Sequence, residues 1–247
     1  MEWRVATVPT FDETVDEGCI EQKFMFSAGK ENLLLDWIEF HVVRDPEFYR
    51  SPIISLYYDT PSLDLYREAS DGDYLKTKVR LRWYEAVFGP DQQSVNCYLE
   101  VKRKYGTLRN KQRKGVALYP NCLGGDLFSN ESILEVPALL PELNYFVRGI
   151  LVPLLVVQYD RYRFVDPQSG CRISLDTGIG CPRANPAYIS ATTPLELASG
   201  VVEVKGSLET LPDFLLPMGH HLTRSKFSKY VRCVERLIEP LDWREPA

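Results

Sequence analysis

The stretch YLKTKVRLRWY, at residues 74–84, limits how this chain can fold. Cationic residues occupy every second position, and apolar residues and one threonine fill the positions between them. A strand points alternate side chains to opposite faces, whereas a helix would scatter these charges around its axis. The branched and aromatic residues favour a strand, and no glycine or proline interrupts it. The stretch therefore predicts a strand with four cations on one face, which are Lys76, Lys78, Arg80 and Arg82.

A cationic face of one strand is most often its solvent side, but here the pattern recurs along the chain. Four like charges on one strand repel each other unless an anion lies among them. Further strands are expected at 19–26, 52–60, 97–105, 109–113, 154–165, 171–179 and 200–207. Most of them carry charged residues at alternate positions, as Glu100, Lys102 and Lys104 do. A hairpin turn at Gly106 would bring this last strand beside Arg109, Lys111 and Arg113.

About eight antiparallel strands predict a mainly β fold of the α+β type, and closure of the sheet would gather their charged faces. In a closed antiparallel barrel all strands share one inner face. We therefore expect a closed eight-stranded β-barrel tunnel with a charged lumen and with helices packed outside. Apolar spacing predicts those helices at 29–44, 131–140, 141–150, 208–216 and 225–238. A charged lumen requires water or a polyanion, because burying unpaired charge is costly.

The charge distribution points to a focused anion site. The 247-residue chain has a net charge of −5, which argues against general nucleic-acid affinity. Residues 74–116, however, contain 11 Lys and Arg against 3 Asp and Glu. The basic strands also carry aromatic residues that would suit single-stranded nucleic acid, but the net charge and the lumen placement disfavour that reading. We expect a small polyanion as the ligand and no nucleic acid.

Length and composition are typical of one large soluble domain. We expect a loose N-terminal arm at 1–18, a single domain at 19–240 and a C-terminal tail at 241–247. No apolar run approaches the roughly 18 residues of a membrane span, and no secretory signal is visible at the start. The six scattered cysteines have no CxxC spacing, and they predict reduced thiols in a cytoplasmic protein, with a Cys171–Cys181 disulfide as the less favoured alternative.

Six short motifs in order resemble one known family. They are SLYYDT (55–60), KVRLRWY (78–84), YLEVKRK (98–104), RISLDTGI (172–179), VVEVKGS (201–207) and SKFSKY (225–230). Together they resemble the VTC domain, named for the vacuolar transporter chaperone, in the triphosphate tunnel metalloenzyme or CYTH-like superfamily. The resemblance runs from about Glu21 to Ile238. It implies an eight-stranded tunnel in which ATP is polymerised into polyphosphate; superfamily relatives hydrolyse triphosphates or make cyclic AMP.

The resemblance also suggests roles for individual residues. We expect catalytic contacts to phosphate from Arg80, Arg82, Lys102 and Lys226, the last at one tunnel mouth. Other groups expected to bind substrate phosphates are Lys23, Lys78, Lys104, Lys111, Arg113, Tyr159, Arg161, Arg172 and Lys205. Arginine makes planar bidentate contacts with phosphate, while lysine supplies point charges.

A divalent cation, Mn²⁺ or Mg²⁺, is the expected cofactor. Its hard oxygen ligands would be Glu203, with Glu100 or Glu21 second. For Glu203 the alternative is a salt bridge inside the lumen, and for Glu100 pairing with a cation of the neighbouring strand is equally reasonable. The usual Glu-x-Glu-x-Lys of the triphosphatases is reduced here to Glu21-x-Lys23, which weakens the case for a second metal. Three histidines and no paired thiolates make zinc unsuitable.

Three functions therefore stay open from the sequence. The leading one is a polyphosphate polymerase acting on ATP, and the runner-up is an inorganic triphosphatase or polyphosphatase. The third is a module that binds polyphosphate or nucleotide without turnover. Eukaryotic VTC members carry a separate sensor domain and a membrane segment, neither of which is visible here. The resemblance thus implies a stand-alone version that would need a membrane-protein partner for transport. The sequence does not fix the oligomeric state.

Overall fold

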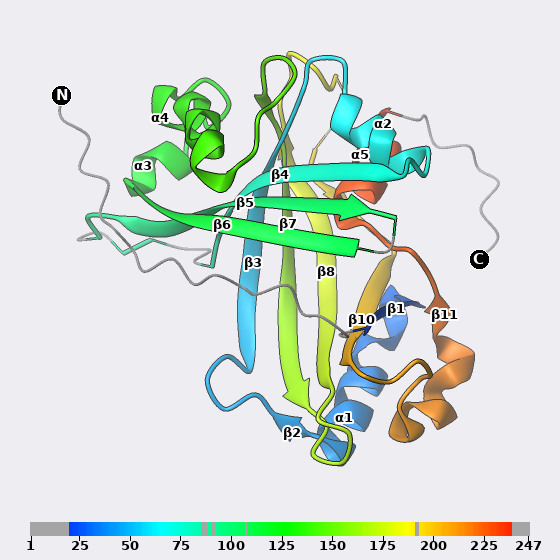
Figure 1. Cartoon of the computed structure of the whole chain (residues 1–247). Coiled ribbons are helices and arrows are strands. Elements are labelled where there is room, and N and C mark those ends of the chain that lie inside the picture. Colours follow the sequence, from blue (N-terminus) through cyan, green and yellow to red (C-terminus); the bar gives the residue numbers. More distant parts are fainter. Residues whose placement is uncertain (1–19, 85–87, 90–91, 107, 191–192, 239–247) are drawn as a thin grey trace.

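The computed structural model describes residues 20–84, 88–89, 92–106, 108–190 and 193–238 (Figure 1). The predicted arm at 1–18 and tail at 241–247 lie outside this part of the chain. The strands are β1 (Ile20–Ser27), β2 (Val43–Arg44), β3 (Arg50–Asp59), β4 (Leu75–Trp83), β5 (Val95–Tyr105), β6 (Leu108–Leu118), β7 (Val152–Val165), β8 (Arg172–Ala184), β9 (Leu195–Glu196), β10 (Ser199–Gly206) and β11 (Thr223–Arg224). The helices are η1 (Ala28–Lys30), α1 (Glu31–His41), α2 (Asp64–Ser70), α3 (Pro120–Leu123), α4 (Glu131–Glu135), η2 (Val136–Leu143), η3 (Asp213–His221) and α5 (Lys229–Ile238).

One antiparallel sheet holds all these strands, in the order β11-β1-β10-β8-β7-β3-β4-β5-β6, with β2 beside β7 and β9 beside β8. Three of the eleven strands have only two residues, so the eight long strands agree with the sequence prediction. The predicted closure is not confirmed, since the sheet is an open path within the described residues. The outer edge of β1 is occupied by β11, and β6 reaches β1 through side chains, with Arg109 paired to Glu21.

Strand register explains why the basic residues meet. Across β4, β5 and β6, Lys78 lies opposite Lys102, which lies opposite Lys111. One step further, Arg80 lies opposite Glu100. Since side chains alternate along each strand, these residues share the inner face of the curved sheet. In the outer apolar row, Val79 and Leu81 are fully buried.

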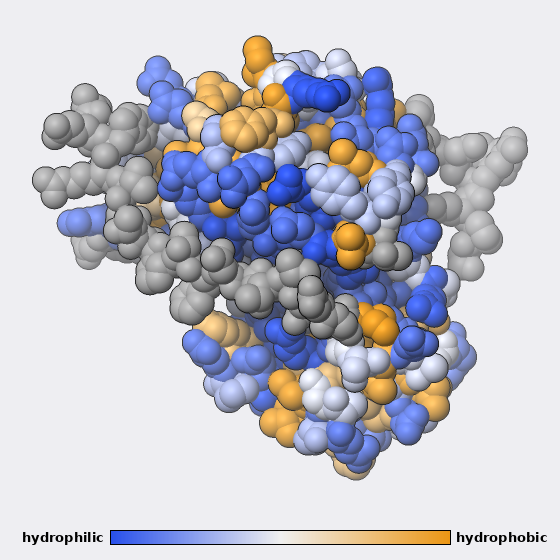
Figure 2. Space-filling view, viewed as in Figure 1, coloured by the Kyte–Doolittle hydropathy of each residue, from blue (hydrophilic) through white to orange (hydrophobic). Residues whose placement is uncertain are grey.

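Two apolar clusters lie on the outer face, as predicted. One joins the backs of β3, β4 and β5 to α3, α4 and η2, with Leu123, Ile133 and Leu140 as helical contributors. The other joins β1, β8 and β10 to α1 and η3. Figure 2 shows hydrophilic side chains predominating over β5 and β6, on the face that it displays. The helices therefore cover the apolar backs of the strands and leave the inner face for the charged rows.

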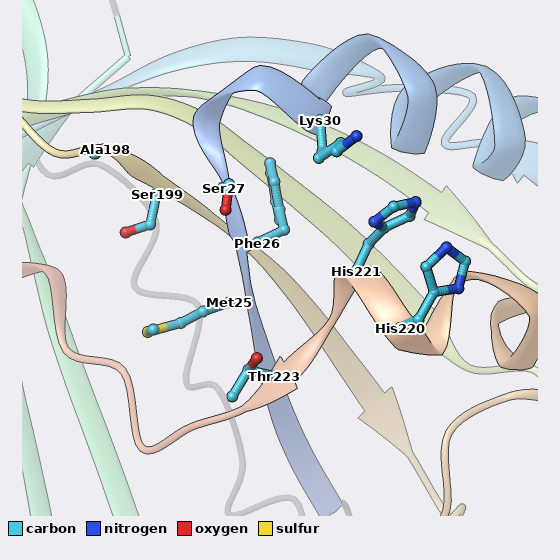
Figure 3. A pocket seen from close by; sticks show the side chains of 9 residues that line it. All are labelled: Met25, Phe26, Ser27, Lys30, Ala198, Ser199, His220, His221 and Thr223. Atoms are coloured by element: carbon cyan, nitrogen blue, oxygen red, sulfur yellow. The ribbon is translucent and has the colours of Figure 1, made fainter. Parts of the chain in front are cut away.

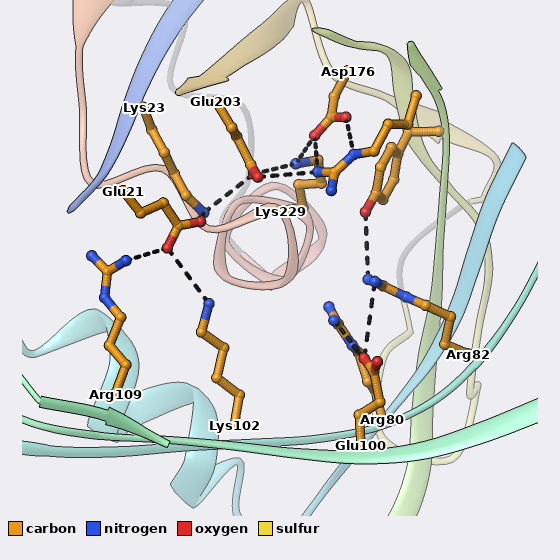
Figure 4. A network of polar contacts seen from close by, with 12 residues as sticks. Glu21, Lys23, Arg80, Arg82, Glu100, Lys102, Arg109, Asp176, Glu203 and Lys229 are labelled. Carbon is orange, nitrogen blue, oxygen red and sulfur yellow. Dashed lines mark hydrogen bonds and ion pairs between the residues drawn. The ribbon is translucent and has the colours of Figure 1, made fainter. Parts of the chain in front are cut away.

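Helix α5 departs from the prediction, because it packs against the inner face of the sheet. Its buried residues join inner-face residues of β3, β7, β8 and β10 in one cluster. Tyr230 stacks on Tyr57, with ring centroids 4.6 Å apart, and its hydroxyl donates to the buried Asp59 carboxylate. The inner faces of these strands are apolar at one end, so an amphipathic helix is needed to cover them. The start of α5 consequently lies within the curve of the sheet (Figure 4).

Other differences are local. The chain after β3 forms α2, a helix absent from the sequence prediction, where the Asp59 carboxylate accepts from the backbone amides of Leu65 and Tyr66. The helix expected at 141–150 is wrong beyond Leu143, where η2 ends. All five described cysteines are free, so the disulfide alternative is wrong. Among the described residues, no helix is both long and apolar enough to cross a membrane. The cytoplasmic location stays a prediction.

Candidate functional site

A cavity of about 270 Å³ lies on the inner face of the sheet and is strongly cationic. Eleven Lys and Arg side chains line it, against two glutamates. The cationic members are Lys23, Lys78, Arg80, Arg82, Lys102, Lys111, Arg113, Arg161, Arg163, Lys205 and Lys229. Such an excess of one sign within low-dielectric walls concentrates the field and attracts anions.

Arg80 is held in place by two neighbours. Its Nε donates to Glu100 Oε2 at 2.6 Å, and Nη1 donates to the Tyr57 hydroxyl at 3.1 Å. Glu100 is 1% exposed and also pairs with Lys111 at 3.0 Å. Burial raises the pKa of Glu100, but Arg80, Arg82 and Lys111 outweigh burial and leave this pKa far below its ordinary value. Glu100 is therefore an ionised anchor beneath the cations.

Arg82 approaches the cavity from the next inner position of β4. Its Nε donates to Ser55 Oγ at 3.1 Å, and Nη2 donates to the Tyr159 hydroxyl at 3.4 Å. Burial raises the pKa of Tyr159, but Arg82, Arg161 and Lys229 together lower it overall. The hydroxyls of Ser55 and Tyr159 hold the Arg82 side chain in place, and its nearest carboxylate oxygen, on Glu100, is 3.9 Å away.

A second anchored guanidinium comes from β7. Arg161 makes a bidentate pair with Asp176, at 2.6 and 2.7 Å, and reaches Glu203 at 3.1 Å. Lys229, at the start of α5, joins the same group, at 2.5 Å from Asp176 and 3.3 Å from Glu203 (Figure 4). Burial raises the pKa of Glu203, but Lys23, Arg161 and Lys229 hold it well below its ordinary value. Both carboxylates are thus ionised.

Lys23 lies between two carboxylates of the site. Its Nζ is 3.4 Å from Glu21 Oε1 and 3.3 Å from Glu203 Oε1. Glu21 also pairs with Lys102 at 3.7 Å and with Arg109. Burial raises the pKa of Glu21, but Lys102 and Lys23 lower it to about 2. The ammonium of Lys23 therefore marks a position at which two ionised carboxylates bind a cation.

Two lysines of the cavity are poorly compensated. Burial, reinforced by Lys23, Lys102 and Arg80, lowers the pKa of Lys78 to about 7. Burial also lowers the pKa of Lys102 to about 8, although Glu21 opposes it. Lys78 donates to the neutral Ser228 hydroxyl at 2.6 Å. An anion in the cavity would restore the charge of both lysines, because a nearby negative charge favours the protonated form.

Most of the predicted site residues come together here. Twelve of them line the cavity, which are Glu21, Lys23, Lys78, Arg80, Arg82, Lys102, Lys111, Arg113, Tyr159, Arg161, Glu203 and Lys205. Glu100 lies just beneath, paired with cations. Lys104 and the exposed Lys226 lie beyond the lining, near enough for Lys226 to help lower the pKa of Lys104. Arg172 is exposed, opposite Lys205 in register but outside the lining.

Sequence reasoning missed Lys229 and undervalued Asp176. The resemblance selects Lys226 from the SKFSKY motif, yet Lys226 is exposed and Lys229 is the buried lysine that reaches the cavity. Spacing alone could have raised the question, because residues three apart on a helix lie on nearly the same face. Asp176 is fully buried and pairs with Arg161.

A second cavity, of about 260 Å³, lies beside the end of β1 (Figure 3). His220 and His221, with ring centroids 3.8 Å apart, share it with Lys30 and small hydroxyl side chains. The two histidines end η3, and no group of three or more metal-ligating side chains occurs among the described residues. This cavity holds none of the predicted site residues.

The described strands thus form an open antiparallel sheet whose inner face holds a cation-rich cavity. The sequence profile of the VTC domain matches residues 20–238, so the chain belongs to the VTC domain family. No curated protein sequence matches it.

Two solved structures, each described as a "putative adenylate cyclase", are similar to the chain. The one from Bacillus halodurans is 15% identical, covers 78% of this chain and 83% of its own, and has a TM-score of 0.43. The one from Vibrio parahaemolyticus is 12% identical, covers 86% of this chain and 97% of its own, and has a TM-score of 0.39.

Proposed function

We propose that the cavity binds the phosphate chain of ATP, triphosphate or polyphosphate and catalyses metal-dependent phosphoryl transfer, with synthesis of polyphosphate from ATP as the leading reaction. The observation that carries the proposal is the lining of eleven cations and two glutamates. Phosphoryl transfer consists mainly of positioning and of neutralising charge, and a row of cations supplies both. Membership of the VTC domain family supports this reading.

The cations divide into two kinds with separate roles. Arg80 and Arg161 are each fixed by a buried carboxylate, so their guanidinium planes are oriented before substrate arrives. Lys78 and Lys102 carry the depressed pKa values, so an incoming phosphate would favour their charged forms. The arginines would orient phosphate oxygens, and the lysines would neutralise the charge that develops during transfer. Lys111 and Arg82 also line the cavity and would contact the bound phosphate chain.

The donor set fits a divalent ion at one position. Lys23 Nζ already lies between the oxygens of Glu21 and Glu203, at 3.4 and 3.3 Å. Mg²⁺ and Mn²⁺ accept carboxylate oxygen and complete their shell with water and substrate phosphate, so two protein ligands suffice. Glu203 and Glu21 would hold the ion once Lys23 turns toward substrate. Glu100 pairs with Arg80 and Lys111 and does not contact Lys23, so we place it second to Glu203 and Glu21 as a ligand. The ion would bridge and neutralise phosphate oxygens.

The test is incubation with ATP and Mn²⁺, followed by gel separation of polyphosphate and measurement of free phosphate. Wild type should give long chains, and Arg80→Ala and Glu203→Ala should each lose about 100-fold in rate or more. Free phosphate without chains would select the triphosphatase reading, which the same cavity serves if water is the acceptor. Tight polyphosphate binding with no turnover would select the binding module and refute the enzyme. Coupling to a membrane-protein partner stays a further proposal.

A further inference from the structure

The two ends of the cation row on β4 differ in their chemistry. At the first end, burial and the neighbouring cations Arg109, Lys76 and Lys226 lower the pKa of Lys104. Of the aromatic residues nearby, Tyr105 falls on the opposite face by alternation, whereas Tyr74 continues the inner row but is 76% exposed and lies outside the cavity lining. This lysine end, composed of Lys76, Lys104, Arg109 and Lys226, gathers four cations, of which Arg109 is paired with Glu21.

The other end of the row is aromatic. Tyr84 follows Arg82 by two residues, so it continues the inner row and lines the cavity. Tyr98 lies opposite Arg82 in register, which puts its ring on the same face. The two rings are 6.1 Å apart, at an interplanar angle of 66°. The Arg113 guanidinium lies 5.1 Å from the centroid of the Tyr98 ring.

A second guanidinium borders the same end. Arg163 Nη1 donates to the Phe48 carbonyl at 3.0 Å and to Ser51 Oγ at 2.8 Å. Burial, and then Arg161, lower the pKa of Arg163, while Tyr84 counteracts them, which places Tyr84 within its electrostatic reach. Two partly buried tyrosine rings and two guanidiniums therefore meet where the row of phosphate-binding cations stops.

We propose that this tyrosine end, composed of Tyr84, Tyr98, Arg113 and Arg163, binds the base of a nucleoside triphosphate. The inference rests on the proposed function and deepens it, because it names a nucleotide as the substrate and fixes its direction. Every base has a π-face that stacks on aromatic rings and guanidinium planes. Tyr84 lies about 7 Å along the strand from Arg82, at about 3.4 Å per residue, which leaves room for the ribose. The terminal phosphate then points toward the lysine end.

The test compares ATP with inorganic triphosphate by calorimetry, without divalent metal. In Tyr84→Leu and Tyr98→Leu, the ratio of the ATP dissociation constant to that of triphosphate should rise about tenfold, equivalent to about 1.4 kcal/mol. Tyr105→Leu, on the outer face at the lysine end, is the matched control and should leave the ratio within about twofold of wild type. Equal ratios in all three variants would overturn the inference.

Saturation-transfer NMR on wild type avoids any dependence on the folding of the variants. Protons of the adenine ring should receive strong saturation, and an unsaturated ring on a bound phosphate chain would refute the tyrosine end. If wild type binds neither ATP nor triphosphate, the proposed function fails together with this inference. If triphosphate binds and the ratio of the two dissociation constants is the same in wild type and in every variant, the base site is refuted and the proposed function is not.

Discussion

Phosphate binding should be accompanied by proton uptake at mildly alkaline pH, and the structure gives its size. The unliganded cavity lowers the pKa of Lys78 to about 7 and that of Lys102 to about 8. At pH 8, about nine tenths of Lys78 and half of Lys102 would then be uncharged. A bound triphosphate favours the charged forms, so each triphosphate should take up about 1.4 protons.

The assay is calorimetry at pH 8 in two buffers of different ionisation enthalpy, whose difference in binding heat gives the proton count. The affinity for triphosphate should also fall between pH 7.5 and 9.5, by about tenfold per pH unit for each proton taken up on binding. Lys78→Arg keeps its charge throughout and should reduce the uptake to about 0.5 protons. An affinity that does not change over this range, with no proton uptake, would refute the reasoning that these lysines face the ligand.

Three further predictions concern stability. The pKa of Lys78 is lower in the folded than in the unfolded protein, so the free energy of unfolding should rise as the pH rises above about 7. Lys78→Met should therefore raise the melting temperature of the unliganded protein and weaken its binding of triphosphate. Glu100→Gln leaves two buried guanidiniums less compensated and should lower the free energy of unfolding by about 3 kcal/mol in urea titrations; an unchanged midpoint would contradict this. Tyr230→Phe removes the hydroxyl that donates to Asp59 and should cost about 1–3 kcal/mol, again by urea titration, and a neutral result would show that this contact does not anchor α5.

Alternation along single strands was enough to predict the inner cation rows. The period of two in residues 74–84 placed Lys78, Arg80 and Arg82 on one face, and the structure has them lining one cavity. The hairpin turn at Gly106 correctly paired β5 with β6, which put Lys111 opposite Lys102. Strand alternation and hairpin pairing both depend on residues close together in the sequence, so a short stretch is enough to predict them.

Features that depend on long-range packing were harder to foresee. Closure was expected, but whether β6 reaches the backbone of β1 depends on sheet curvature, and a side-chain pair from Arg109 to Glu21 spans that gap instead. Likewise, no local pattern distinguishes an inner from an outer amphipathic helix, so the position of α5 and the role of Lys229 were missed. The ion pair of Arg161 with Glu203 joins strands far apart in sequence, so no local pattern indicated it, and the role of the carboxylates as metal ligands stays a prediction.

The most direct test of the central claim is a crystal structure of the protein soaked with inorganic triphosphate. We expect one triphosphate along the inner face of β4, with oxygens contacting Arg80, Lys102 and Arg161 and with Lys23 drawn away from Glu203. Triphosphate bound only on the outer surface, with the ion pairs of the cavity unchanged, would contradict it.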